Sequence, residues 1–172
     1  MQFDIADPVR SRAKNAHELF ILNLIAFHLL LAPAAIALGI GAWALLLTPL
    51  FSLPVLGYIF LRSRRAETRD PWFVMVHWKV AVQRAKLLLI SYAVTAVILL
   101  VVFVLTQGAE GSMQEILFTV FTRVGVMPVV ITVFVTFVLE SSALNQAGQG
   151  EVPDRLVQRY PAPDDVQPVS VD

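Results

Sequence analysis

The chain has 172 residues, of which 57% are hydrophobic and 15% are charged, and its formal net charge is zero at pH 7. Soluble domains carry about 25% charged residues, so this composition excludes an ordinary soluble domain and predicts an integral membrane protein. A net charge of zero gives no indication of nucleic-acid binding. The absence of cysteine excludes disulfides, thiolate metal sites and cysteine nucleophiles.

A cytoplasmic N-terminal arm (residues 1–18) leads into a predicted first transmembrane hairpin (residues 19–62). The first 43 residues of this hairpin contain no Asp, Glu, Lys or Arg. One crossing takes about 20 residues, so this length suits two spans. We place them at about 19–38 and 43–62.

Glycine and proline mark the turn and the bends of this hairpin. The turn is expected at Gly39-Ile40-Gly41, because two glycines permit a tight reversal. Pro33 then falls inside the first helix, and Pro49 and Pro54 fall inside the second. Prolines are tolerated in membrane helices but usually bend them.

Residues 63–86 form a basic segment between the two hairpins. Asp70-Pro71 is typical of a helix start, with Asp as the N-cap and Pro at the first helical position. From Trp72 to Lys86, a helical wheel separates apolar side chains from cations. We therefore predict an amphipathic segment at the membrane interface, with its aromatic rings inserted and its cations contacting lipid phosphates. Together with Arg123 and His28 in the predicted spans, the candidate lipid- or partner-binding residues are Arg62, Arg64, Arg65, Arg69, Trp72, Trp78 and Lys79.

A second transmembrane hairpin is predicted over residues 87–140, with spans at about 87–106 and 114–139 and a polar turn at 107–112. The remaining segment, 141–172, contains four prolines and five acidic residues. It shows no helical or strand periodicity, so we expect it to be disordered without a partner. The predicted fold is therefore all-α, with four transmembrane helices in two hairpins.

The distribution of cations predicts the orientation. Twelve of the thirteen Lys and Arg residues lie in the N-terminal arm, in residues 62–86 or in the C-terminal tail, and neither hairpin turn contains one. The positive-inside rule then places both termini and the middle segment in the cytoplasm. Arg outnumbers Lys ten to three beside abundant Ala and Val, which indicates a bacterial source and hence the bacterial inner membrane.

Arg123 is the only charged residue between Ile116 and Leu139. A guanidinium in hydrocarbon costs about 2.5–3.5 kcal/mol on insertion scales, which suggests a buried cation that pairs with a partner's carboxylate or lines a polar path. Alternatively, residues 113–122 form an interfacial turn and Arg123 extends to the lipid phosphates.

His28 lies near the middle of the first predicted span. A mid-membrane imidazole could bind haem or relay protons. A bis-His haem needs a second histidine within a span, whereas His17 and His77 are expected at or outside the cytoplasmic interface. The sequence therefore favours a hydrogen-bonded, neutral His28 between helices, and no cofactor or metal site is predicted.

Motifs for catalysis are absent from the sequence. There is no Gly-rich phosphate loop, no His-x-x-x-His pair and no Ser-centred elbow, so we do not expect an enzyme. The favoured hypothesis is an accessory or scaffolding subunit that binds other membrane subunits through its helices, Arg123 and the tail. The alternatives are a homo-oligomeric channel or small transporter with Arg123 facing the pore, and a haem anchor based on His28.

Overall fold

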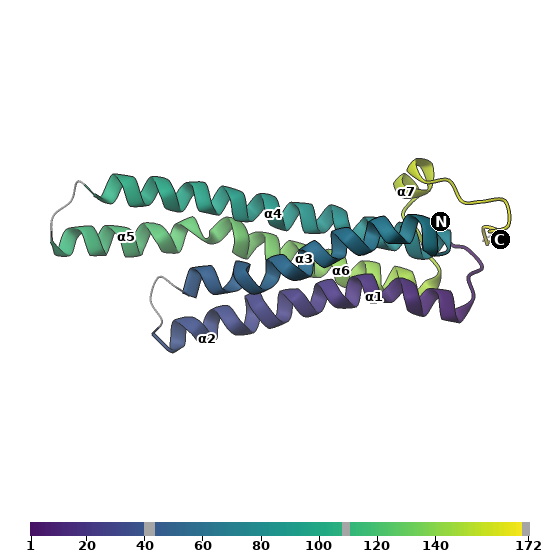
Figure 1. Ribbon diagram of the computed structural model, residues 1–172, viewed down its shortest axis with the longest axis horizontal. Coiled ribbons are helices and arrows are strands. Elements are labelled where there is room, and N and C mark those ends of the chain that lie inside the picture. Colours follow the sequence, from purple (N-terminus) through teal and green to yellow (C-terminus); the bar gives the residue numbers. More distant parts are fainter. Residues whose placement is uncertain (40–43, 108–110, 170–172) are drawn as a thin grey trace. The chain divides into compact units, whose positions relative to one another are not determined.

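The computed structural model describes residues 1–39, 44–107 and 111–169 (Figure 1). Its elements are α-helices and one π-helical stretch, as the predicted all-α class requires. In chain order they are α1 (Asp7–Asn23), the π-helix η1 (Leu24–Leu31), α2 (Ala32–Ala37), α3 (Ala44–Arg69), α4 (Trp72–Thr106), α5 (Ser112–Gly125), α6 (Met127–Gln149) and α7 (Asp154–Arg159).

Four helical stretches of the described chain are long and apolar enough to cross a membrane. They are Asp7–Ala37, Leu46–Arg69, Trp72–Thr106 and Ser112–Gln149. This confirms the predicted number of potential spans. Each stretch is longer than the span predicted from the sequence, because helix continues into the charged residues that border each apolar run.

Two compact units make up the chain. Unit 1 comprises Met1–Ala85 and Phe137–Asp172, and unit 2 comprises Lys86–Thr136. Helices α4 and α6 contribute residues to both units. Each unit is described by itself below.

In unit 1, α3 packs along the helix formed by α1, η1 and α2 (Figure 1). The hydroxyl of Thr48 donates to the carbonyl of Phe27 at 3.3 Å, and the rings of Phe27 and Phe51 stack with centroids 5.8 Å apart. η1 ends just before Pro33. Proline lacks an N–H and crowds the carbonyl four residues earlier, so a wider turn at this place accommodates it.

The end of α2 agrees with the predicted turn as far as the structure describes it. Gly39 has a φ of +69° directly after the helix, a conformation that glycine adopts without a steric penalty. Ile40 and Gly41 lie outside the described residues. Pro49 and Pro54 both lie inside α3, as expected.

The predicted amphipathic segment is the first part of α4 and continues without a break into the predicted third span. Much of it is buried inside unit 1, including Phe73, Val76 and Trp78. Asp70 was predicted to be the N-cap, but the N-cap in the structure is Pro71. Its carbonyl accepts the first helical hydrogen bond, from the N–H of Met75 at 3.1 Å. The Asp70 carboxylate pairs with arginines instead.

In unit 2, the fourth apolar run contains a helix break that the sequence analysis did not anticipate. Pro128 has no N–H to donate, and α5 ends three residues before it, at Gly125.

Gly125 also lies close to α4. A Cβ at Gly125 would lie only 3.1 Å from the side chain of Ile98 and 3.2 Å from that of Leu99. Glycine therefore allows α5 to approach α4 closely at this point.

The sequence shows no helical periodicity after residue 140, but part of this segment is helical in the structure. Helix α6 continues to Gln149, and Gly150, with a φ of +76°, ends it. The N–H of Glu151 donates to the carbonyl of Gln146 at 2.9 Å, which is the hydrogen bond of a Schellman cap.

The segments after α6 pair with the first residues of the chain. The N–H of Phe3 donates to the carbonyl of Gly150 at 3.0 Å, and the N–H of Val169 donates to the carbonyl of Gln2 at 2.9 Å. Bridges also join Gln2 to Glu151 and Phe3 to Pro168. These bonds link residues about 150 positions apart, so local sequence periodicity contains no sign of them.

Candidate functional site

Four charged or titratable side chains meet inside unit 1. His17 comes from α1, His77 and Arg84 come from α4, and Glu140 comes from α6. The side chains of His17, His77 and Glu140 are fully buried, whereas that of Arg84 keeps 16% of its surface exposed. We call these four residues the His–Glu cluster.

The cluster is a continuous chain of short polar contacts. His17 Nδ1 lies 2.6 Å from Glu140 Oε2, and His17 Nε2 lies 2.9 Å from His77 Nδ1. On the other side of the carboxylate, Arg84 Nη1 lies 3.3 Å from Glu140 Oε1. His17 therefore uses both ring nitrogens, one toward a carboxylate and the other toward a second imidazole.

Alanines bring the three helices close enough for these contacts. Each helix has two buried alanines within two turns of a cluster residue along its own axis. Small side chains permit close helix approach, so short polar side chains can reach across. The alanines are Ala13 and Ala16 on α1, Ala81 and Ala85 on α4, and Ala143 and Ala147 on α6.

The position of the cluster follows from the charge pattern. Glu140 is the first charged residue after the apolar run of α6, and Arg84 is the second-last cation before the apolar run of α4. His17 precedes the uncharged run of the first helix by two residues. Because their distances from the apolar runs are similar, the three side chains lie at a similar height along the helix axes. A buried carboxylate there requires a cation or several hydrogen-bond donors.

The arrangement supports cross-linking of helices more than chemistry on a substrate. Both nitrogens of His17 already have protein partners, so no lone pair of this ring is free for another ligand. Within the residues that the structure describes, no group of three His, Asp or Glu side chains is placed to hold a metal ion.

Four of the predicted lipid- or partner-binding residues form contacts within unit 1. Lys79 pairs with Glu67. Arg62 lies 2.5 Å from Asp70 Oδ2 and stands over the ring of Trp78 at 5.2 Å. The indole of Trp72 donates to the carbonyl of Tyr160 at 2.9 Å.

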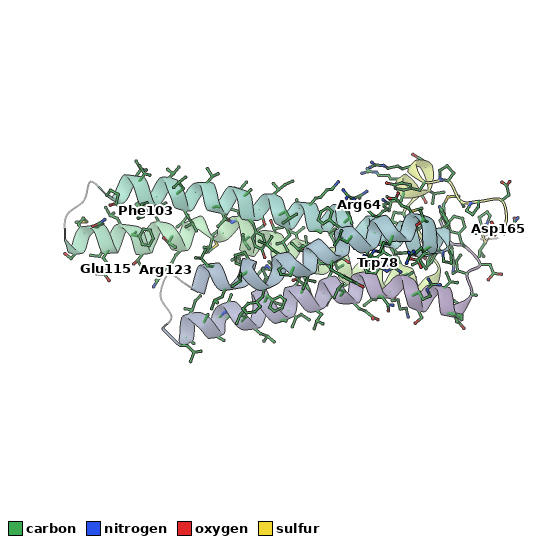
Figure 2. All side chains as sticks on the ribbon, in the orientation of Figure 1. Arg64, Trp78, Phe103, Glu115, Arg123 and Asp165 are labelled. Atoms are coloured by element: carbon green, nitrogen blue, oxygen red, sulfur yellow. The ribbon has the colours of Figure 1, made fainter. Side chains whose placement is uncertain are left out.

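The other predicted cations are exposed. Arg64, Arg65 and Arg69 lie on α3, and Arg123 lies on α5 (Figure 2). None of the four has an ion pair among the described residues. The structure thus divides the basic segment into cations with internal partners and cations that face outward.

His28 is buried in η1, as expected for a histidine between helices. Its Nδ1 lies 3.4 Å from the carbonyl of Asn23. The nearby side chain of Asn23 is also buried, and neither of its amide atoms has a hydrogen-bond partner in the described chain.

The sequence analysis did not find the His–Glu cluster. It placed His17 and His77 at or outside the membrane interface and gave no role to Arg84 or Glu140. One available signal was that His17, Arg84 and Glu140 each lie within three positions of an apolar run. That signal does not show which residues meet, because His17 is 60 positions from His77 and 123 from Glu140.

The fold defines a helical chain with four potential membrane spans, and its described site is a buried ionic cluster. Comparison with known proteins adds no family to this description. No protein-family model matches the sequence, and the searches of curated proteins and of solved structures found no match.

Proposed function

We propose that this protein is a non-catalytic accessory or scaffolding subunit of a larger membrane complex. It would cross a bacterial inner membrane as two helical hairpins, with both termini and the basic segment in the cytoplasm. The single observation that carries the proposal is Arg123, which is exposed in unit 2 and has no ion pair among the described residues.

The surroundings of Arg123 support a partner surface. Ile116, Val120 and Val124 are exposed at spacings of four residues along α5, so they share one helical face with Arg123. An unpaired guanidinium on an apolar membrane helix is costly. A carboxylate on another subunit's helix would offset that cost and make the contact specific.

The polar groups of unit 1 support a structural role. The His–Glu cluster and the Asp70 and Glu67 ion pairs join helices of the same chain. Ionic groups that pair with one another across helices position those helices but leave few groups to act on a substrate. Helices fixed in this way in unit 1, and an exposed cation in unit 2, fit a subunit that organises its neighbours.

Anionic lipid is the second partner that we propose. On α3, Tyr58 and Leu61 are exposed, and Arg65 and Arg69 follow Leu61 by one and two turns on the same face. An exposed face that changes from apolar to cationic fits the boundary between acyl chains and headgroup phosphates.

Purification of the native protein in mild detergent followed by native mass spectrometry tests the subunit proposal. We expect a co-purifying membrane subunit that is lost in Arg123→Ala and retained in Glu115→Ala, a charge change on the same helix. A monodisperse monomer with no other subunit would contradict the proposal.

The same cation favours one alternative, a homo-oligomeric channel or small transporter with Arg123 facing the pore. A homo-oligomer in the mass spectrum, together with anion flux in proteoliposomes that Arg123→Ala changes, would support it. Loss of assembly without any flux would support the subunit role.

A further inference from the structure

The contact between His17 and His77 allows only one proton between the two rings. Their facing nitrogens, His17 Nε2 and His77 Nδ1, are 2.9 Å apart, so one must donate and the other accept. His17 Nδ1, 2.6 Å from Glu140 Oε2, must carry a proton to donate to that carboxylate. The geometry therefore restricts the protonation states of both histidines.

Three protonation states satisfy this geometry. In the first, both rings are neutral and His77 donates to His17. In the other two, one of the rings is an imidazolium, and the proton between the rings belongs to either His17 or His77. A further proton would make both rings cationic and place two N–H donors against each other in a site that excludes water.

We propose that the His17–His77 contact is an acid-sensitive lock that holds α1 against α4 and α6. The closed lock accommodates at most one imidazolium. Once the helices separate, each imidazole meets water and protonates independently. Acidification thereby favours release.

The direction of the pH effect follows from proton counting. Exposed imidazoles protonate with a pKa of about 6.5, so well below this pH the released form binds at least one more proton than the closed form. The equilibrium then shifts toward release, by about tenfold or more per pH unit.

The other charged groups around the pair set the limits of this behaviour. Glu140 of α6 and Arg84 of α4 are the charged members of the cluster beside the two rings. The positive charge of Arg84 disfavours a second positive charge nearby. The ring of Phe73 covers His77 with centroids 4.6 Å apart, and Glu18, next to His17, is exposed.

The absence of cysteine makes a distance measurement specific. Asn15 on α1 and Gln83 on α4 are both exposed in unit 1, and cysteines introduced at these two positions take spin labels at no other site. Pulsed electron paramagnetic resonance in lipid nanodiscs reports the separation of α1 and α4. We expect one short distance at about pH 7.5 and a growing, longer population toward about pH 5.5.

His77→Gln removes the second titrating ring but keeps an amide that can bond to His17 Nε2. We expect the acid-induced population to disappear in this variant. The same substitution at His28, which lies outside the cluster, serves as the control and should leave the pH response intact. Persistence of the response in His77→Gln would overturn the lock.

The parent chain, with both cluster histidines in place, provides a second test that does not depend on the folding of a histidine variant. If the doubly labelled chain with both cluster histidines keeps one unchanged distance from about pH 7.5 to about pH 5.0, the proposal is wrong, because both exposed rings would be largely protonated over the lower part of that range.

Discussion

The indole N–H of Trp72 donates to the main-chain carbonyl of Tyr160 across a gap of 2.9 Å and 88 positions of sequence. The same ring meets Phe3 edge to face, with centroids 5.1 Å apart. One tryptophan at the start of α4 thus contacts both the first residues of the chain and the segment after α7. This contact explains how a proline-rich tail becomes ordered without helical periodicity of its own.

We predict that Trp72→Phe loosens the tail. Phenylalanine keeps an aromatic contact with Phe3 but cannot donate to Tyr160, and loss of one such hydrogen bond costs about 0.5–1.5 kcal/mol. Trypsin should then cleave after Arg155 and Arg159 roughly 2- to 10-fold faster. The cleavage rate in detergent is the measurement.

Trp78→Phe is the matched control for this experiment. The indole nitrogen of Trp78 is buried and has no hydrogen-bond partner in the described chain, so its loss removes no bond to the tail. Equal cleavage rates in the two variants would show that the Trp72 hydrogen bond does not hold the tail.

Gly150→Ala should destabilise the C-terminal part of unit 1. The residue has a φ of +76°, and a Cβ there would lie 2.7 Å from the carbonyl oxygen of Phe3. The left-handed conformation alone costs a non-glycine residue about 1–2 kcal/mol, and relief of the clash would displace the N-terminal segment. Thermal unfolding followed by tryptophan fluorescence measures the loss.

Gly57→Ala is the control for Gly150→Ala, and we expect it not to destabilise the protein. Gly57 lies inside α3, and a Cβ there would meet no atom within 4 Å. Alanine is favoured over glycine inside a helix by about 0.5–1 kcal/mol, so this variant should be as stable as the parent or slightly more stable. A similar loss in both variants would contradict the geometric explanation.

These two glycines illustrate which features can be predicted from sequence. Long runs without charge predict membrane helices, because the cost of charge in hydrocarbon acts on every residue of a span. They do not predict where a helix ends within polar sequence. At the end of α6, the carbonyl of Gly150 accepts a hydrogen bond from the N–H of Phe3, far away in the chain.

The candidate site, like the fold, can be predicted from the sequence only in part. A single charge in an apolar run, such as Arg123, is visible in the sequence, and the structure leaves it exposed. The partners of Glu140 are not visible, since they come from two other helices. Arg62 and Lys79 also looked like free cations until the structure placed Asp70 and Glu67 beside them.

Glu140→Gln should be among the most destabilising single substitutions in unit 1. It removes the negative charge that compensates Arg84 and leaves the guanidinium partly buried without a counterion. Removal of one partner from a buried ion pair costs about 3–5 kcal/mol. The free energy of unfolding, from denaturant titration in mixed micelles followed by circular dichroism, is the measurement.

Glu18→Gln is the control for Glu140→Gln, because Glu18 is exposed and has no ion pair among the described residues. Surface substitutions of this kind change stability by about 0.5 kcal/mol or less. If the two variants lose the same stability, the buried cluster does not stabilise the fold as its geometry indicates.

The last prediction concerns the exposed arginines of α3. Arg65→Gln combined with Arg69→Gln should weaken retention of anionic phospholipid, because these cations directly follow the exposed Leu61 on the same helical face. At about 1 kcal/mol per basic residue, the loss is about 2 kcal/mol, or roughly 30-fold in affinity. Native mass spectrometry with phosphatidylglycerol and phosphatidylcholine in competition measures it. Arg155→Gln combined with Arg159→Gln removes the same charge from α7, away from this apolar face, and should have a much smaller effect. An equal loss in both pairs would mean that net charge alone, and not the α3 face, attracts the lipid.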